Sequence, residues 1–374
     1  MTIVIFSSVF NHHSLPLCDA LNELCQGNFY FVETMQEEEQ RRALGYHAYE
    51  RNYVINSLAS EENAQKAKEL ALTADVMIAS VFPYELLKER LKLKKLTFLC
   101  QERMFKGGVS FKRRVRAWFF NVRKYLRFKN SPLYFLSIGK GAAEDYKSIG
   151  FYKNKSFLWG YYPPFIEYDP HKLIESKRSD EINILFVGRL IELKHPEYSL
   201  NAAKMLLNKG NKVTLTYIGC GEMEEELRTS ANGVPEISFL GSMSPEKVRE
   251  YMAGANVFTF TSNSFEGWGA VVNEAMNSGC AVIASEEAGA SSTLIVDGRN
   301  GFLFKNDDFD EFYRKLESLV SNCELIENMG EQAYNTIANE FNAKIAAERL
   351  FAFSESLLKG EKSQEYSKGI LKKL

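Results

Sequence analysis

Two glutamates eight positions apart are the side chains best placed to do chemistry. Glu266 and Glu274 bracket a Gly-Trp-Gly turn in the stretch NSFEGWGAVVNEA, which covers residues 263–275. A short apolar run, Val257–Thr261, precedes the turn and a helical pattern follows it. A junction of strand, glycine turn and helix start presents backbone N–H groups and the positive end of a helix dipole, which suit a phosphate. Because carboxylates only accept hydrogen bonds, they suit a hydroxyl-rich ligand.

A pair of cations follows an earlier apolar run. Ile182–Val187 is predicted to be a strand, and it ends in Gly188 and Arg189, with Lys194 five residues further on. An arginine fork and a lysine point charge beside a glycine turn can bind a diphosphate. Taken alone, this segment favours the alternative that it is a surface turn with two incidental cations.

Together, the glutamate pair and the stretch GRLIELKHP (residues 188–196) resemble the retaining glycosyltransferases of family 4, which have the two-domain GT-B fold. The resemblance implies that Glu266 is catalytic and lies against the donor sugar, that Glu274 holds the ribose, and that Arg189 and Lys194 bind the pyrophosphate. Because these cations replace a divalent ion, it implies metal-independent transfer without a cofactor.

The resemblance also implies a substrate class. The donor would be a nucleoside-diphosphate sugar, with UDP favoured over GDP, and the acceptor a glycan or lipid-linked glycan of capsule, O-antigen or lipopolysaccharide synthesis. Gly289 would allow close backbone approach to the donor. The remaining residues assigned to donor binding lie in turns where backbone groups can make the contacts: Gly188, Gly219, Ser242, Gly267, Trp268 and Gly269.

Apolar runs alternate with helical patterns in the N-terminal half, which predicts a Rossmann-like parallel sheet. The expected strands are Ile3–Phe6, Phe29–Val32, Val76–Ala79, Leu96–Cys100 and Tyr134–Ile138. The expected helices include Leu15–Leu24, Glu61–Leu72 and Pro83–Leu91. No G-x-G-x-x-G follows the first strand, so a dinucleotide site there is not expected.

Polar residues follow two of these strands, where ligands of open α/β sheets bind. Asn11, His12 and His13 follow the first strand and are candidates for acceptor binding; the alternative is a polar loop with Ser14 capping the next helix. Glu102 and Arg103 follow the fourth strand. Many family 4 enzymes carry a histidine near this point, so Glu102 is a candidate for sugar contact or for a catalytic base, and Arg103 for acceptor binding.

The segment Arg103–Lys129 holds ten Lys or Arg, no acidic residue and seven interleaved aromatic residues. From Lys112 onward it contains no proline or glycine, which predicts a basic amphipathic helix. One interpretation is a solvated helix face whose aromatic residues lie in the core. We favour docking on an anionic membrane surface, because basic residues near headgroups and aromatic residues at the interface both promote it. Nucleic acid is not expected as a partner, because the rest of the chain offers no supporting basic surface.

A length of 374 residues predicts two domains. We expect an α/β protein with two Rossmann-like domains facing each other across a cleft, residues 1–165 for the acceptor and 166–344 for the nucleotide sugar. The proline-containing polar stretch 160–180 is expected to be a linker. A last helix within residues 345–374 is expected to cross back to the first domain, and the tail from Gly360 to fray.

The remaining features limit location and chemistry. Six scattered cysteines without a C-x-x-C pair indicate buried thiols in a reducing compartment and neither zinc nor disulfides. The sequence predicts no membrane span and no signal peptide, so we expect a cytoplasmic protein that attaches peripherally to the inner face of the membrane. Two alternative functions stay open: a GT-B sugar-nucleotide epimerase, and a non-catalytic membrane-associated partner subunit.

Overall fold

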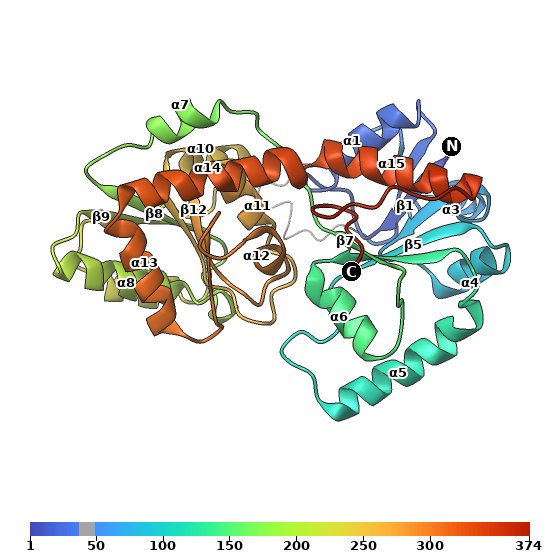
Figure 1. Cartoon of the computed structure of the whole chain (residues 1–374), viewed down its shortest axis with the longest axis horizontal. Coiled ribbons are helices and arrows are strands. Elements are labelled where there is room, and N and C mark those ends of the chain that lie inside the picture. Colours follow the sequence, from blue (N-terminus) through green and yellow to red (C-terminus); the bar gives the residue numbers. More distant parts are fainter. Residues whose placement is uncertain (37–48) are drawn as a thin grey trace. The chain divides into compact units, whose positions relative to one another are not determined.

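The computed structural model describes residues 1–36 and 49–374. This part of the chain divides into two compact units (Figure 1). The N-terminal unit comprises Met1–Pro164 and Glu340–Leu374, and the C-terminal unit comprises Phe165–Asn339. Each unit is built around one parallel sheet whose strands alternate with helices, as the alternation of apolar runs and helical patterns predicts.

The N-terminal sheet has seven strands in the order β3-β2-β1-β4-β5-β6-β7 among the described residues, all parallel. All five predicted strands are confirmed, each within one or two residues of its ends; β3 and β7 were not predicted, because runs of three and four residues carry little periodic signal. The strands are β1 (Ile3–Ser7), β2 (Phe29–Glu33), β3 (Val54–Asn56), β4 (Val76–Ala79), β5 (Leu96–Gln101), β6 (Leu133–Ile138) and β7 (Ser156–Trp159).

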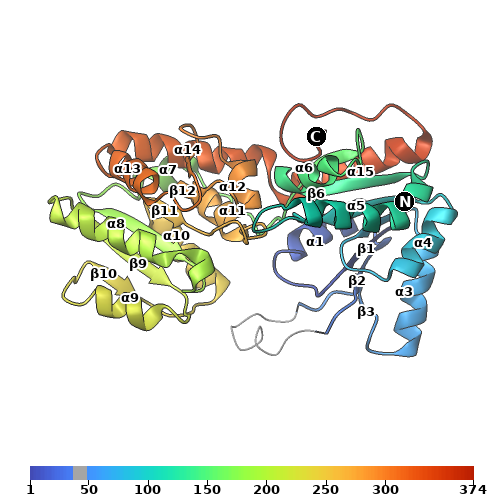
Figure 2. The ribbon, with the colours of Figure 1, turned by 90° about the horizontal axis from the view of Figure 1, so that it is seen from below.

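Helices cover both faces of this sheet (Figure 2), so central strands such as β4 are buried along their whole length. The helices of this unit are α1 (Leu15–Leu24), α3 (Glu61–Thr73), α4 (Tyr84–Lys92), α5 (Phe111–Tyr125), α6 (Lys140–Ser148) and α15 (Ala343–Lys359), with a 3₁₀ turn at Leu126–Phe128.

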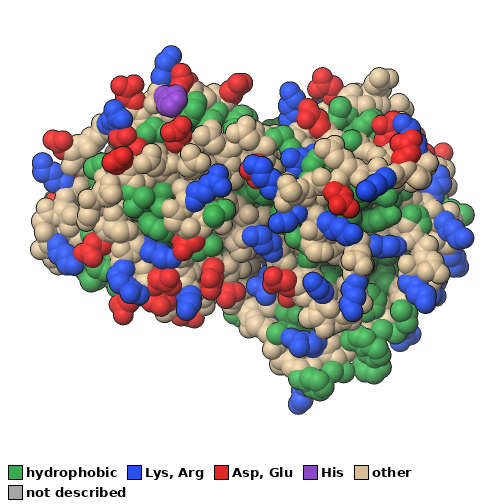
Figure 3. Space-filling model, in the orientation of Figure 1, with side chains coloured by type: hydrophobic (Ala, Val, Ile, Leu, Met, Phe, Trp, Pro, Cys, Tyr) green, Lys and Arg blue, Asp and Glu red, His purple; other side chains and the backbone are tan. Residues whose placement is uncertain are grey.

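The predicted basic helix is α5. Its N-cap Ser110 accepts a hydrogen bond from the backbone N–H of Arg113 at 3.3 Å. Only Asn121 among its residues is buried, while Phe111, Phe119 and Phe120 are exposed. Hydrophobic and basic side chains therefore gather on the surface over α5, at the bottom right of Figure 3. The interpretation that all of the aromatic residues lie in the core is wrong for this helix.

The last helix returns to the N-terminal unit. Asn342 caps α15 by accepting from the Ile345 N–H, and α15 packs lengthwise against α1 (Figure 1). The helix ends at Gly360, whose φ of 70° is the left-handed conformation that a helix C-cap favours.

The expectation that the tail frays is wrong. Beyond α15 the chain runs antiparallel to β7, with Leu158 donating to Lys372 at 2.8 Å and Leu371 donating to Leu158 at 2.9 Å. Ile370 is fully buried and Leu371 almost so. The tail covers the edge strand β7, and two apolar residues in a polar tail gave no periodic pattern from which this could be predicted.

The C-terminal sheet has six strands in the order β10-β9-β8-β11-β12-β13, again parallel. Its strands are β8 (Ile182–Val187), β9 (Val213–Ile218), β10 (Ile237–Phe239), β11 (Val257–Phe260), β12 (Ala281–Ser285) and β13 (Phe302–Phe304). Its helices are α7 (Pro170–Glu175), α8 (Pro196–Asn208), α9 (Glu224–Ser230), α10 (Pro245–Gly254), α11 (Ala270–Asn277), α12 (Gly289–Leu294), α13 (Phe309–Val320) and α14 (Cys323–Glu340), with a 3₁₀ turn at Glu192–Lys194.

The strand order of this sheet reverses between β8 and β11. With right-handed crossovers, the helix after β8 and the helix after β11 then lie on opposite faces of the sheet. Accordingly α8 packs with α13, and α11 with α10. The chain leaving β8 and the chain leaving β11 therefore run to opposite faces of the sheet, which leaves room for a ligand between the two loops.

The predicted linker is only partly a linker, because residues 170–175 form α7. Asp169 caps this helix, and Leu173 and Ile174 are buried against the unit. Lys177 is also buried and donates to the carbonyls of Ala255 at 2.8 Å and Ser278 at 2.6 Å. Six residues are too few to show helical periodicity among prolines and charges, so the sequence pattern resembled a loop.

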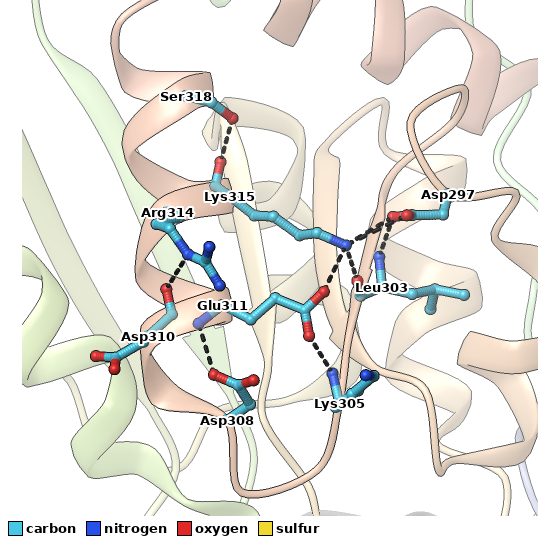
Figure 4. A network of polar contacts seen from close by, with 9 residues as sticks. All are labelled: Asp297, Leu303, Lys305, Asp308, Asp310, Glu311, Arg314, Lys315 and Ser318. Carbon is cyan, nitrogen blue, oxygen red and sulfur yellow. Dashed lines mark hydrogen bonds and ion pairs between the residues drawn. The ribbon is translucent and has the colours of Figure 1, made fainter.

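A polar network joins β13 to α13 (Figure 4). Lys315 Nζ lies 3.2 Å from carboxylate oxygens of Asp297 and of Glu311 and also donates to the Leu303 carbonyl. Glu311 accepts from the Lys305 N–H at 2.9 Å. These contacts hold the loop before β13 to the helix after it, and so fix the outer edge of the sheet.

Candidate functional site

The predicted donor residues lie in the loops at the switch point of the C-terminal sheet. Residues 188–195 connect β8 to α8, and residues 261–269 connect β11 to α11. The two loops are hydrogen-bonded to each other: the Asn263 N–H donates to Leu193 O at 2.9 Å, and Thr261 Oγ1 donates to the carbonyls of Lys194 at 2.6 Å and His195 at 2.9 Å. These bonds fix the backbone from which the Lys194 side chain extends.

The ends of these side chains meet. Lys194 Nζ forms an ion pair and hydrogen bond with Glu266 Oε2, and the two side chains are only 16% and 15% exposed. Lys194 Nζ also lies 5.2 Å from the centroid of the Phe260 ring. Burial alone would raise the pKa of the Glu266 carboxyl, but the charge and hydrogen bond of Lys194 outweigh it and lower that pKa. Glu266 is therefore ionised at neutral pH.

The glycine turn before α11 is held by close packing. Gly269 has φ of 84°, and a Cβ there would lie 2.6 Å from the Phe260 ring, so only glycine fits. The indole of Trp268 is buried, with its N–H donating to Asn273 Oδ1 at 2.8 Å. The ring therefore belongs to the core, which leaves the backbone of Trp268 for the donor contact expected of it.

Gly289, for which we expected close approach to the donor, packs against the Gly-Trp-Gly turn. The N–H groups of Gly289 and Ala290 donate to the carbonyls of Gly267 at 3.0 Å and Trp268 at 2.8 Å. A Cβ on Gly289 would lie 3.1 Å from both the Gly267 oxygen and the Trp268 ring. The start of α12 thus supports the Gly-Trp-Gly turn from behind, a function that the spacing of these residues did not indicate.

The other predicted glycines meet at the carboxyl ends of β8 and β9. Gly219 has φ of 130°, and a Cβ on it would lie 2.0 Å from the carbonyl oxygen of Gly188. Its N–H donates to Gly241 O at 2.8 Å, and Ser242 Oγ lies 3.5 Å from Cys220 Sγ. Three successive loops therefore approach each other through their backbones, which places Gly188, Gly219 and Ser242 in one cluster.

Two further predicted residues, Arg189 and Glu274, differ in exposure. Arg189 is exposed, and within the described residues its guanidinium forms no ion pair. Glu274 lies in α11 and is partly buried; burial raises the pKa of its carboxyl to about 7, although the nearby Arg249 guanidinium favours the charged form. Arg189 is thus a free fork for an anion, and Glu274 is a partly buried carboxyl that accepts from a hydroxyl group when it is ionised.

In the N-terminal unit, Asn11, His12 and His13 form the turn between β1 and α1. Asn11 Oδ1 accepts from the N–H groups of His13 at 3.0 Å and Ser14 at 3.2 Å. Ser14 makes no side-chain cap hydrogen bond, so the expectation that it caps α1 is wrong. Its backbone is already helical, with φ of −84° and ψ of −30°, whereas a capping residue is usually extended. His12 is buried and its ring lies 3.7 Å from that of His13, centroid to centroid.

Glu102 and Arg103 point into different environments. Glu102 pairs with Lys106 at 2.6 Å and accepts from the Tyr161 hydroxyl at 3.0 Å. Arg103 Nη2 lies 3.6 Å from Asp145 Oδ1, and its side chain passes so close to Gly141 that a Cβ there would be 2.7 Å from Arg103 Cδ. Asp145, which the sequence did not single out, also accepts from the Phe105 N–H and so anchors this loop.

Comparison with known proteins relates the C-terminal unit to a protein family. Residues 169–336 match the family described as glycosyl transferases group 1. This part of the chain belongs to that family. The predicted resemblance to family 4 is therefore confirmed, and it is carried by the stretch that holds Arg189, Lys194, Glu266 and Glu274.

Curated relatives match the same half of the molecule. An uncharacterized glycosyltransferase of Methanocaldococcus jannaschii is 31% identical over 46% of this chain and 45% of its own length. The capsular polysaccharide biosynthesis glycosyltransferase CapM of Staphylococcus aureus is 28% identical over 50% of this chain and 49% of its own. The chain thus spans about half the length of these relatives.

Solved structures match the whole chain at low identity. The crystal structure of Anabaena HepE in complex with UDP gives a TM-score of 0.69 at 14% identity, covering 96% of this chain and 100% of that one. A glycosyltransferase of Rickettsia africae gives a TM-score of 0.66 at 13% identity, covering 96% and 99%. With the two parallel Rossmann-like sheets and the contact of α15 with α1, these similarities confirm the predicted GT-B fold.

None of the helices described here combines the length and the hydropathy needed to cross a bilayer.

Proposed function

We propose that this protein is a retaining glycosyltransferase that moves a sugar from a nucleoside-diphosphate sugar to a glycan or lipid-linked glycan. The observation that carries the proposal is the buried Lys194–Glu266 pair beside the exposed Arg189, at the switch point of a group 1 domain. UDP is favoured as the nucleotide, because structures of the similarly folded HepE hold UDP and UDP-glucose. CapM and the amylovoran glycosyltransferase AmsK of Erwinia amylovora support an acceptor in polysaccharide synthesis.

In this proposal, the charges of the site act on the leaving group. The planar Arg189 fork binds the diphosphate, while Lys194 shares its ammonium between Glu266 and a phosphate oxygen. Glu274 accepts from the ribose hydroxyls. Glycines 188, 219, 267 and 269, the Ser242 loop and the backbone of Trp268 supply close backbone contacts to the donor. Stabilising charge that develops on the departing UDP is the largest contribution that such groups make to catalysis.

The transfer step breaks the bond between the anomeric carbon and the β-phosphate oxygen. The acceptor hydroxyl oxygen forms the new bond on the same face of the sugar, and its proton passes to the departing phosphate oxygen. Glu266 holds the sugar and stabilises the positive charge that develops at the anomeric carbon. The alternative is a covalent intermediate on the Glu266 carboxylate, followed by attack of the acceptor. No metal ion is needed in either route, since Arg189 and Lys194 supply the positive charge.

We assign acceptor binding to the N-terminal unit, through Asn11, His12, His13 and Arg103. Glu102 is a second catalytic candidate as a base, held ready by the Tyr161 hydroxyl. We further propose that the segment Arg103–Lys129 attaches the enzyme to the inner, cytoplasmic face of the membrane. Each basic residue near an anionic surface contributes about 1 kcal/mol, and the exposed Phe111 and Phe119 add apolar contact.

Slow donor hydrolysis tests the activity without knowledge of the acceptor. Release of UDP from a panel of UDP-sugars is measured, with the anomeric configuration of the freed sugar followed by NMR. We expect release above the buffer rate, with retention, and its loss in Glu266→Ala. No release, or equal release by Glu266→Ala, would contradict the proposal. Conversion of the donor to an isomeric sugar nucleotide would support the epimerase instead.

Co-sedimentation with vesicles tests membrane attachment. We expect binding to vesicles that contain phosphatidylglycerol, weakened as salt rises, and no binding to vesicles of phosphatidylcholine alone. The paired variant Arg114→Glu/Arg123→Glu should reduce this binding, whereas Arg314→Glu on the exposed face of α13 should not. Vesicle binding that changes neither with salt concentration nor in the α5 charge variant would rule out this role for the segment.

A further inference from the structure

An open cavity lies beside α5 in the N-terminal unit, and the exposed Phe120 forms part of its wall. Its volume is about 740 Å³, which falls within the roughly 300–1,000 Å³ of small-molecule sites. It lies between α5 and the carboxyl ends of β4 and β5, and its apolar wall includes Phe82, Leu99, Met104, Phe105 and Phe120. The vesicle-binding proposal concerns the charged and apolar surface of the whole segment and does not explain why a cavity of this size lies beside α5.

The same cavity carries positive charge from one face of α5. Arg113, Arg116 and Lys124 line it, and no acidic side chain is among the described residues that do. Lys124 Nζ lies 4.1 Å from the centroid of the Phe120 ring and 4.5 Å from that of Tyr84, and Arg113 lies 5.8 Å from that of Phe105. Aromatic rings thus hold Lys124 and Arg113 without neutralising them. An anion entering the cavity would find unpaired charge.

A buried polar group also lines the cavity. Asn121 is 1% exposed; its Nδ2 donates to the Ala117 carbonyl at 2.8 Å, but Oδ1 has no partner among the described residues. A buried acceptor without a partner costs about 1–3 kcal/mol. The amide orientation is set by the bond to Ala117, so the open position needs a donor, such as a hydroxyl group. Core packing alone does not account for an asparagine at this place.

The chemistry of the walls therefore specifies three features of a ligand: an apolar chain, an anionic group and a hydroxyl. The exposed apolar side chains of α5 lie on the outer surface of the same helix, so a lipid held at the membrane would be close to the cavity (Figure 3). Gln101 lines the cavity, and Glu102 follows it directly in the chain. A ligand in the cavity would thus lie beside the end of β5, next in the chain to the candidate base Glu102.

We propose that the cavity beside α5 binds the phosphorylated lipid of a lipid-linked acceptor, with the chain against the aromatic wall and the phosphates on Arg113, Arg116 and Lys124. This inference rests on the proposed function, whose acceptor it narrows to a lipid phosphate or diphosphate. It predicts that the protein recognises single lipid molecules, whereas docking by the helix surface needs a bilayer.

Calorimetry with geranylgeranyl diphosphate, below the concentration at which it forms micelles and without vesicles, tests this. UDP is present at saturation, so that the donor site does not take up the diphosphate. Inorganic pyrophosphate and geranylgeraniol are the controls for the head and the chain. The variants are Ala117→Trp, which fills the cavity, and Arg116→Glu; Arg123→Glu makes the same charge change on α5 outside the cavity lining.

We expect the lipid diphosphate to bind, with both controls and both cavity variants at least about tenfold weaker and Arg123→Glu within about twofold of wild type. No binding, equal binding of pyrophosphate, or an equal loss in Arg123→Glu would overturn the inference. UDP affinity of the same variants reports whether they fold. If the wild type binds the lipid diphosphate but not UDP, the proposed function fails while the cavity assignment stands; Arg189→Ala then replaces saturating UDP as the control for the donor site.

Discussion

The loops at the carboxyl ends of the two sheets are built in different ways. In the C-terminal unit, glycine backbones approach so closely that Gly219 lies against the Gly188 carbonyl and Gly269 against the Phe260 ring. In the N-terminal unit, the corresponding loops are held by side chains, as in the contacts of Glu102 with Lys106 and of Arg103 with Asp145. A site for a fixed group, such as a nucleoside diphosphate, suits the first construction; acceptors that differ between enzymes suit the second.

The largest expected difference between the units concerns their carboxylates. Glu266→Gln keeps the shape of the side chain but removes its charge, so we expect the rate of donor turnover to fall by about 10²–10³. UDP affinity should be kept or improved, since Lys194 loses its competing partner. Glu102→Gln should lower the rate by about tenfold or less, because the departing phosphate oxygen can take the acceptor proton in its place. Steady-state kinetics of both variants check this. An equal or larger fall in rate for Glu102→Gln would mean that Glu102, and not Glu266, is the main catalytic carboxylate.

A pair of glycine substitutions compares the two constructions directly. In Gly219→Ala the new Cβ meets a backbone oxygen at 2.0 Å in a strained backbone conformation. We therefore expect the free energy of unfolding to fall by about 1–3 kcal/mol and UDP binding to be lost. In Gly141→Ala the Cβ meets the flexible side chain of Arg103 within a helix that favours alanine, so the effect should be within about 1 kcal/mol.

Thermal unfolding and UDP titration of the two variants measure these effects. Comparable melting temperatures for Gly219→Ala and the wild type would show that the glycine backbones are not what fixes the donor loops.

The same contrast explains what the sequence could predict. Apolar strands and helices such as β8, α1 and α15 can be predicted from the periodicity of their apolar residues. The glycine, arginine, lysine and glutamate positions of the C-terminal loops can be predicted because they come soon after a predicted strand. The N-terminal loops are different, because the partners that hold them are distant in sequence. Asp145, which orients the loop after β5, lies 40 residues beyond Phe105, and no local pattern connects the two.

Failures of prediction also had local causes. The tail after Gly360 and the helix α7 are stabilised by a few buried residues in polar surroundings, and hydropathy averaged over such stretches indicates a loop. For Trp268, the sequence indicates the turn but not the direction of the ring, which is buried with its N–H donating to Asn273.

The smallest expected effect is the dependence of stability on acidic pH that the Lys194–Glu266 pair causes. The folded pKa of Glu266 lies below its ordinary value of 4.5, so its pair with Lys194 stabilises the protein above that pH and is lost as the pH falls through the folded pKa. Glu266→Gln should therefore destabilise the protein by about 1 kcal/mol at pH 7, and this difference in the free energy of unfolding should shrink as the pH is lowered stepwise below 4.5. A difference that stays the same throughout this acid titration would mean that the charge of the pair is not what stabilises these loops.

The central claim is that the C-terminal loops bind a nucleoside diphosphate through Arg189 without a metal ion. Calorimetric titration with UDP in the presence of EDTA tests it most directly, with GDP as the competing nucleotide and Arg314→Ala, an exposed arginine on α13, as the matched control. We expect clear binding of UDP that is weakened at least about tenfold in Arg189→Ala and unchanged in Arg314→Ala. Binding that requires a divalent ion, or that survives Arg189→Ala unchanged, would contradict it.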